Sequence, residues 1–132
     1  MLRRGEAFRN RAKRLLAAKK KLSAAWLQAA SPITAEIMAK ARDDILMVDM
    51  EHGPGDIMNL ISQMQAISHY EAVPFVRAPW NDFVTIKRIL DAGVSGILVP
   101  YVNNSKEAAR AVSACKYPME GIRGIDPSPR TG

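Results

Sequence analysis

The chain has 132 residues, enough for one ordinary domain, and its 48% apolar and 24% charged residues are typical of a soluble globular protein. No apolar run approaches the ~20 residues that a membrane-spanning helix needs, so a membrane partner is not expected. The single cysteine, Cys115, excludes an intramolecular disulfide and favours a reducing compartment, for which we take the cytoplasm. We expect Cys115 itself to fill part of the core.

The net charge of +6 is concentrated at one end of the chain. Residues 1–21 hold nine Lys or Arg and one acid, Glu6, a charge of +8, so the remaining residues are slightly acidic. A nucleic-acid-binding domain spreads its basic residues over one folded face, so this distribution argues against a nucleic-acid partner.

The basic segment has the pattern of a helix over residues 2–20 with a thin apolar stripe. Three interpretations stay open. The helix caps the fold, it is an Arg-rich targeting segment that directs the protein to an organelle, or it is a surface for acidic partners. We treat residues 1–21 as a unit of their own, separate from residues 22–132.

From residue 22 onward, strand-like and helix-like patterns alternate. A first strand is expected over residues 22–29, and Ser31-Pro32 then has the residue types of a helix N-cap and first helical position. That helix should end near Arg42. The second strand, Ile45–Val48, is a short apolar run of the kind that is buried on both faces.

The second helix follows Gly55-Asp56, and its apolar residues recur at helical spacing: Ile57, Leu60, Ile61, Met64 and Ile67. His69 stands where this helix should end, and we expect it to be a C-terminal capping residue rather than a ligand. A third strand is expected over Val73–Arg77.

Polar residues and a glycine mark the boundaries of the last predicted helices. Asn81 or Asp82 is expected to cap a third helix that Gly93 closes. A fourth strand is expected over residues 96–102. Asn104 should cap a fourth helix, whose inward face would carry the following side chains: Ala108, Val112 and Cys115.

Four strand–helix units in alternation predict an α/β fold with a parallel sheet and right-handed crossovers. Four units form either a small open sheet or half of an eight-unit (β/α)8 barrel, which typically takes about 250 residues. The chain ends in a loop rich in Gly and Pro over residues 121–132. Since this loop does not resemble a closing element, we expect a half barrel cut from a longer TIM-barrel chain.

The end of the second strand is the candidate site. Asp49, Glu51 and His52 follow the apolar run within four residues, and Gly53-Pro54 then breaks the strand. In parallel α/β folds, the carboxyl ends of the strands are where sites are built. The alternative is a polar turn whose residues only shape the backbone.

Five segments stand in an order that is specific to one family: Val48-Asp-Met-Glu-His-Gly-Pro54, Phe75-Val-Arg-Ala-Pro-Trp-Asn-Asp82, Leu90-Asp-Ala-Gly93, Gly96-Ile-Leu-Val-Pro100 and Tyr117-Pro-Met-Glu-Gly-Ile-Arg-Gly124. In this order they resemble the HpcH/HpaI aldolase family, the class II pyruvate aldolases, which include hydroxy-heptenedioate and keto-deoxy-sugar-acid aldolases and macrophomate synthase. The resemblance implies a (β/α)8 barrel, a homo-oligomer, and cleavage or formation of a carbon–carbon bond next to pyruvate. It also implies a divalent ion, commonly Mg, Mn or Co, that binds pyruvate and stabilises its enolate.

Retro-aldol cleavage needs a base and a positive charge where the enolate oxyanion develops. His52 has a near-neutral unperturbed pKa suited to the base, and the resemblance implies that role. Arg77, at the end of the third strand, is suited to holding a keto or carboxylate oxygen, and an ion pair with Asp49 or Glu51 is compatible with this role. Asp49 is a local candidate for the partner of the imidazole's other nitrogen.

The resemblance implies two further site residues. Asp91 matches an aspartate that raises the basicity of the histidine. Because it stands at the far end of a helix, we expect it to serve the site of a neighbouring subunit; the alternative is a simple structural role at the helix end. Trp26 matches a tryptophan near the substrate, although core packing is the better interpretation from the residues alone.

The family's metal ligands, a glutamate on the fifth strand and an aspartate near the end of the sixth, would lie beyond Gly132. We therefore assign no metal ligand in this chain. The functional hypothesis is a truncated pyruvate aldolase acting on a 2-keto acid and an aldehyde. The alternative is a catalytically incomplete half barrel that acts in assembly.

Overall fold

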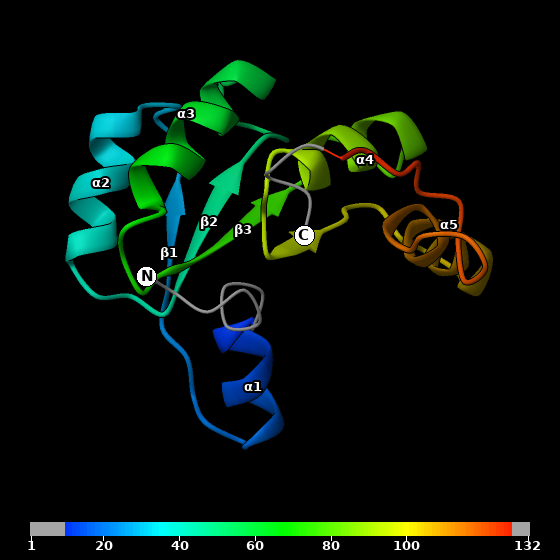
Figure 1. Ribbon diagram of the computed structural model, residues 1–132, viewed down its shortest axis with the longest axis horizontal. Helices are drawn as coiled ribbons and strands as arrows, with labels where there is room; N and C mark the ends of the chain where they lie inside the picture. The colour runs from blue at the N-terminus through cyan, green and yellow to red at the C-terminus, as the bar shows by residue number, and fades with distance from the viewer. Residues whose placement is uncertain (1–9, 128–132) are drawn as a thin grey trace.

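The computed structural model describes residues 10–127 and contains a single parallel sheet with helices (Figure 1). The elements within this range follow in the order α1 (Arg11–Ala17), β1 (Ala24–Leu27), α2 (Pro32–Lys40), β2 (Ile45–Asp49), α3 (Ile57–Ile67), β3 (Val73–Arg77), α4 (Phe83–Asp91), β4 (Gly96–Leu98) and α5 (Ser105–Cys115). The sheet order is β1-β2-β3-β4 and every pairing is parallel. The four predicted strand–helix units are therefore confirmed.

Polar side chains at the helix starts explain why the helices begin where they do. Ser31, Asp82 and Asn104 each accept a hydrogen bond from a backbone N–H in the first turn of α2, α4 and α5. Asp56 and Asn59 form a reciprocal capping box at the start of α3. These caps satisfy donors that have no partner inside the helix. They also fix the loops that leave the carboxyl ends of the strands.

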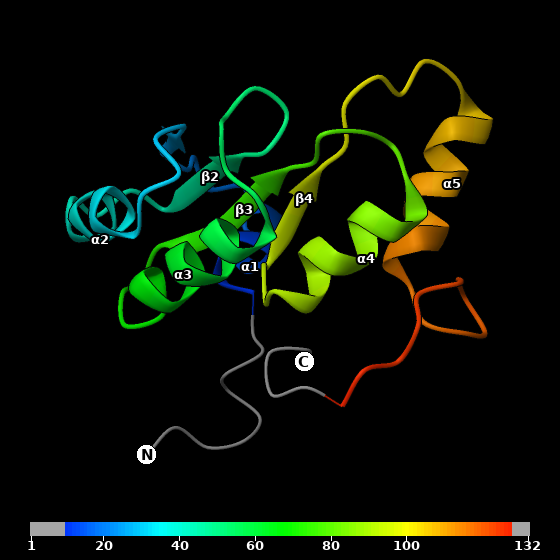
Figure 2. The same cartoon turned by 90° about the horizontal axis from the view of Figure 1, so that it is seen from above.

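The core lies between the sheet and helices α2, α3 and α4, which cover one side of it (Figure 2). Leu46, Val48 and Val76 point from the strands into this layer and are buried. Alternate residues of the same strands point to the opposite side, because successive strand side chains alternate. On that side Trp26 and Leu98 are exposed large hydrophobic residues.

Helix α1 lies at the end of the sheet where the strands begin (Figure 1). The side-chain amide of Asn10 donates to the carbonyl oxygen of Ser95 at 2.6 Å, and Arg11 forms an ion pair with Asp44 at 2.8 Å. Ala12 is fully buried in this contact. The expected helix over residues 2–20 is thus shorter in its described part and stops at Ala17; residues 1–9 lie outside the described residues.

Three local expectations were wrong. The C-cap of α3 is Ser68, so His69 follows the cap rather than forming it. Strand β4 ends at Leu98 rather than at residue 102, since the chain turns at Tyr101, where φ is positive. In α5, Val112 is exposed, whereas the buried residues are Ala111 and Ala114.

The α5 difference has a physical reason. Helix α5 packs against α4 at the end of the described sheet, and both views show it beyond α4 rather than over a strand (Figures 1 and 2). The small side chains of Ala111 and Ala114 allow that close approach, so the buried face of α5 is the one that carries these two residues. Cys115 and Ala108 are half-buried, in keeping with the expected packing role of the cysteine. Within residues 10–127, no helix is long and apolar enough to cross a membrane.

The packing predicts how two leucines differ in their contribution to stability. Leu46→Ala should lower the free energy of unfolding by about 2–5 kcal/mol, because Leu46 is fully buried in the core. Leu16→Ala, on the exposed side of α1, should change it by less than about 0.5 kcal/mol. Urea denaturation followed by circular dichroism measures both. Equal losses in the two variants would contradict the placement of the core.

Candidate functional site

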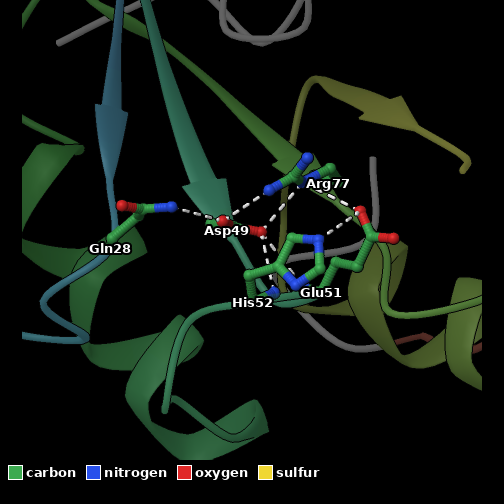
Figure 3. Close-up of polar contacts among 5 residues, drawn as sticks. All are labelled: Gln28, Asp49, Glu51, His52 and Arg77. Carbon is green, nitrogen blue, oxygen red and sulfur yellow. Dashed lines mark hydrogen bonds and ion pairs between the residues drawn. The ribbon is translucent and has the colours of Figure 1, made fainter.

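Polar side chains from three neighbouring strand ends meet at the carboxyl edge of the sheet (Figure 3). Gln28 follows β1, Arg77 ends β3, and Asp49 ends β2 with Glu51 and His52 directly after it. Asp49 and Arg77 are partners in the parallel register, so their side chains lie on the same face of adjacent strands. The expected clustering at this edge is present.

Asp49 and Arg77 form a two-bond fork. Arg77 Nε donates to Asp49 Oδ1 at 2.9 Å, and Arg77 Nη2 donates to Oδ2 at 2.7 Å. This bidentate geometry is the strong form of a carboxylate–guanidinium contact. The Asp49 side chain is completely buried and that of Arg77 is 21% exposed, so the charge pair is largely withdrawn from water.

Three further donors complete the shell of Asp49. The Gln28 amide donates to Oδ2 at 2.9 Å, and the backbone N–H groups of Glu51 and His52 donate to Oδ1 at 3.1 and 3.2 Å. The Arg77 hydrogen bonds, with help from Gln28 and these N–H groups, hold the pKa of Asp49 far below its ordinary value of 3.8 against the opposing effect of burial. Asp49 is therefore a carboxylate at any physiological pH.

Arg77 has two more neighbours that fix its plane. Its Nε lies 3.2 Å from Glu51 Oε2, and its Cζ lies 4.6 Å from the centroid of the Trp26 ring. The hydrogen bond to Asp49 raises the pKa of Arg77 further. No contact within the described part of the chain engages Nη1. The guanidinium thus keeps donors that are available to an oxygen ligand.

His52 stands at the solvent side of this cluster. Its side chain is 64% exposed, and its Nε2 lies 3.8 Å from Glu51 Oε2. The loop beneath it is tightly folded: a Cβ on Gly53 would overlap the carbonyl oxygen of Asp49. The backbone N–H of His52 donates to Asp49, and this bond fixes the position of the residue. The imidazole therefore stays beside Arg77 because its backbone is anchored.

Of three expectations for the site, the ring partner of His52 and the burial of Trp26 differ from the structure, whereas Asp91 lies at the opposite edge, as expected. The carboxylate of Asp49 contacts the backbone of His52, so the ring of His52 faces Glu51 instead of Asp49. Asp91 ends α4 and precedes β4, at the edge opposite to His52, and accepts a hydrogen bond from Arg123 Nη2 at 3.0 Å. Trp26 lies under Arg77 and is exposed, so core packing was the wrong interpretation of this residue.

The sequence analysis assigned no role to Gln28 and did not predict where Arg123 lies or which residue it binds. Gln28 follows the first strand by one residue, and the rule that parallel strand ends share an edge was the signal for it. Arg123 is buried, and its Cζ lies 4.7 Å from the Tyr117 ring. Its pairing with Asp91 spans 32 residues, a separation that no local pattern encodes.

The described carboxylates do not form a metal site. Among residues 10–127, no three His, Cys, Asp or Glu side chains gather in a way that would hold an ion. Both oxygens of Asp49 already accept hydrogen bonds, and Glu51 is turned to Arg77 and His52. The residues present at this edge therefore fit an anion held by a guanidinium better than a divalent cation.

A parallel α/β sheet with its polar cluster at the carboxyl edge is the architecture of a TIM barrel, here represented by four units. The profile of the HpcH/HpaI aldolase/citrate lyase family matches residues 22–130, and the chain belongs to that family.

Solved structures and sequence relatives agree with this assignment. A family protein from Burkholderia cenocepacia superposes with a TM-score of 0.85 at 35% identity, over 89% of this chain and 48% of that one. Macrophomate synthase superposes with a TM-score of 0.78 at 27% identity, over 92% of this chain and 41% of that one. The 5-keto-4-deoxy-D-glucarate aldolase of Salmonella newport is 45% identical over 93% of this chain and 48% of its own length. The chain spans about half the length of these relatives and corresponds to half a barrel.

The buried carboxylate predicts a specific response to acid. Because the pKa of Asp49 is lowered in the folded state, its contribution to stability is complete above the unfolded pKa and is lost as pH falls below it. Urea midpoints measured from about pH 5 to about pH 2 should therefore fall more steeply for the wild type than for Asp49→Asn. At neutral pH, Asp49→Asn should cost about 3 kcal/mol, because Arg77 loses a buried partner.

The matched control is Asp43→Asn, which changes a carboxylate that makes no ion pair among the described residues. This variant should follow the wild-type pH curve. Parallel curves for the wild type and Asp49→Asn would show that Asp49 is not the carboxylate that links folding to pH.

Proposed function

We propose that this chain carries the keto-acid-binding half of a class II pyruvate aldolase, a lyase that breaks or forms a carbon–carbon bond next to a pyruvate unit. The observation that carries the proposal is the Arg77 guanidinium at the carboxyl edge, next to an exposed imidazole. Asp49 fixes this guanidinium, and no contact among residues 10–127 engages its Nη1. Family membership and the relatives' printed names support it.

In the cleavage direction, the substrate is a 2-keto-4-hydroxy acid. A base removes the proton of the 4-hydroxyl, the bond between carbons 3 and 4 breaks, and its electron pair forms the pyruvate enolate while the aldehyde leaves. In this proposal His52 is the base. Arg77 holds the oxygens of the keto acid and offsets the negative charge that develops there.

Asp49 is a positioning residue in this scheme. It fixes the plane of Arg77, and through two backbone N–H groups it fixes the loop that carries His52. Trp26 supports the guanidinium from the other side. A guanidinium that is oriented before the substrate arrives has less entropy to lose on binding, which is how preorganised sites gain affinity.

Asp91 enters through the family resemblance, which gives it the task of raising the basicity of the histidine. Its position at the opposite edge from His52 supports a role across a subunit boundary, in the site of a neighbouring copy. A homo-oligomer is part of this proposal.

The resemblance also implies a divalent ion, which would polarise the keto oxygen and stabilise the enolate when bound. Since the described carboxylates do not fit such an ion, no step of this proposal passes through it. The proposed substrate class is a keto-deoxy sugar acid, by similarity to the relative named 5-keto-4-deoxy-D-glucarate aldolase, and the proposed location is the cytoplasm.

A second candidate function is an assembly module without activity of its own. Trp26 and Leu98, exposed on the side of the sheet that the described helices leave uncovered, favour it, because exposed apolar surface promotes association. In this described part of the chain, β1 and β4 each pair on one side only, which leaves strand edges open to another sheet. Concentration-dependent association without catalysis would distinguish this function from the first.

The aldolase proposal predicts proton exchange at C3 of pyruvate. Proton NMR in deuterated buffer, recorded with and without added manganese, should show exchange by the 132-residue protein. His52→Ala should lower its rate by about 100-fold or more, since a positioned base contributes about 100- to 10,000-fold. Addition of a chelator tests dependence on the ion.

His69→Ala is the matched control. His69 lines a different pocket, of about 450 Å³, with Arg42 and Tyr70 at the edge where the strands begin. This variant should exchange pyruvate like the wild type. Exchange no faster than manganese alone would mean that this chain does not catalyse enolisation, which leaves the assembly function.

A further inference from the structure

Two aromatic rings stand together on the same edge of the sheet as the candidate site. The ring centroids of Trp80 and Tyr101 are 5.0 Å apart with a tilt of 36°. Both residues are largely exposed, Trp80 by 56% and Tyr101 by 61%. The pair therefore presents apolar surface to solvent and contributes little to the core.

The strand register places the two loops that carry this pair side by side where they leave the sheet, one of them directly after Arg77. Arg77 and Leu98 are partners across β3 and β4. Trp80 follows Arg77 by three residues and Tyr101 follows Leu98 by three residues, so both rings stand on the loops that leave these two paired positions. The aromatic pair thus continues the carboxyl edge from Arg77 toward β4.

The backbone under the pair is strained and held. Tyr101 has φ 54°, a left-handed conformation that costs energy for a residue with a side chain. The side-chain amide of Asn103 donates to the carbonyl oxygen of Tyr101 at 2.9 Å, and the backbone N–H of Asn103 donates to Glu107 Oε2 at 2.7 Å. These hydrogen bonds therefore stabilise the backbone conformation that holds the exposed Tyr101 ring in place.

A further bond ties the two loops together. The Asn81 side-chain amide donates to the carbonyl oxygen of Glu107 at 3.0 Å, which links the loop that carries Trp80 to the helix start below Tyr101. The hydrogen bond from the Asn103 backbone, with others from Asn104 and Asn103, lowers the pKa of Glu107, so this carboxylate stays ionised and able to hold the loop.

We propose that Trp80 and Tyr101 form a stacking subsite for the hydroxylated carbon chain of the substrate, and that they determine specificity for sugar acids. This inference rests on the proposed function, since it assumes that Arg77 holds the keto-acid end. A polyhydroxylated chain has hydroxyl groups on its edges and C–H groups on its faces. The faces fit an aromatic ring, while the edges stay in water or meet the Tyr101 hydroxyl and the Trp80 indole N–H.

The geometry favours this occupant over a purely apolar one. The loops that carry the rings start from Arg77 and its register partner Leu98, and the Asn81 and Asn103 amides hold these loops. A ligand that extends from Arg77 to the rings must therefore carry charge at one end and polar groups along its length. A keto-deoxy sugar acid has this composition. Simple aldehydes offer little surface for stacking, so the pair would select against them.

Indole NMR of the 132-residue protein tests the subsite. The chain has two tryptophans, Trp26 and Trp80, and Trp80→Phe assigns their two indole N–H signals. D-Glucarate, a six-carbon sugar diacid, should shift the Trp80 signal in a saturable manner. Succinate, a dicarboxylate without hydroxyl groups, should shift it far less.

Variants provide the second measurement. Tyr101→Gly removes the ring and accepts the positive φ without strain, so the fold should be retained. Its dissociation constant for D-glucarate should rise at least about tenfold, because one stacked ring is lost. A tenfold rise corresponds to about 1.4 kcal/mol of binding free energy. Ile33→Ala, a change of another exposed apolar residue, on α2, should bind like the wild type.

Three results would overturn the subsite: no shift of the Trp80 signal with D-glucarate, an equal shift with succinate, or an unchanged dissociation constant in Tyr101→Gly. Pyruvate exchange on the same sample separates the two proposals. Absent exchange with a saturable Trp80 shift would count against the aldolase chemistry and support the subsite. Normal exchange with an unshifted Trp80 would support the chemistry and remove the subsite.

Discussion

The ionised carboxylate of Asp49 is the constraint around which the candidate site is built. A buried charge costs several kcal/mol unless charged and polar groups surround it. Asp49 satisfies this requirement with Arg77, Gln28 and two backbone N–H groups. Each partner belongs to a different segment, so one carboxylate fixes the ends of three strands and the turn after β2. Loss of that charge would release Arg77 and the His52 loop together.

The parallel sheet makes this arrangement possible. In parallel pairing, residues at equal register stand side by side, and their side chains point to the same face. The charged pair therefore needs no special loop geometry. The loop has its tightest steric requirement at Gly53, where any larger residue would meet the carbonyl oxygen of Asp49. The turn that presents His52 is compact because its tightest position is a glycine.

Features encoded in short stretches could be predicted from the sequence. The caps at Ser31, Asp82 and Asn104, the glycine after α4 and the apolar run of β2 all depend on neighbouring residues. The collection of Asp49, His52 and Arg77 at one edge followed from topology, since carboxyl ends of parallel strands share an edge. The parallel alternation and the family's motifs together predicted the half barrel, which the comparisons confirm.

What could not be predicted depends on contacts between distant segments. The choice between Asp49 and Glu51 as the neighbour of the His52 ring is decided by Arg77, which occupies Asp49 from another strand. The buried stripe of α5 is decided by the approach of α4, not by the helix's own pattern. The resemblance placed Asp91 in a site, but its partner within the chain, Arg123, became apparent only from the fold.

A comparison of the two arginines shows why only one of them is suited to a ligand. Arg77 and Arg123 are built alike: each binds an aspartate and lies over an aromatic ring, at 4.6 Å from Trp26 and 4.7 Å from Tyr117. They differ in access. The Arg123 side chain is 10% exposed and its Nε is buried without a hydrogen-bond partner in the described structure, so its charge serves to fasten the loop after α5 to the end of α4.

Arg77, at 21% exposure, stands at the edge where the strands end, and its Nη1 points its donors away from Asp49. An arginine clamp becomes a binding group only when part of its fork is left open to solvent. By that criterion we propose that the carboxyl edge, with Arg77, His52 and the aromatic pair, is the side of this molecule that receives an anion. On the opposite side, the partly buried Asp91–Arg123 pair joins the end of α4 to the loop after α5.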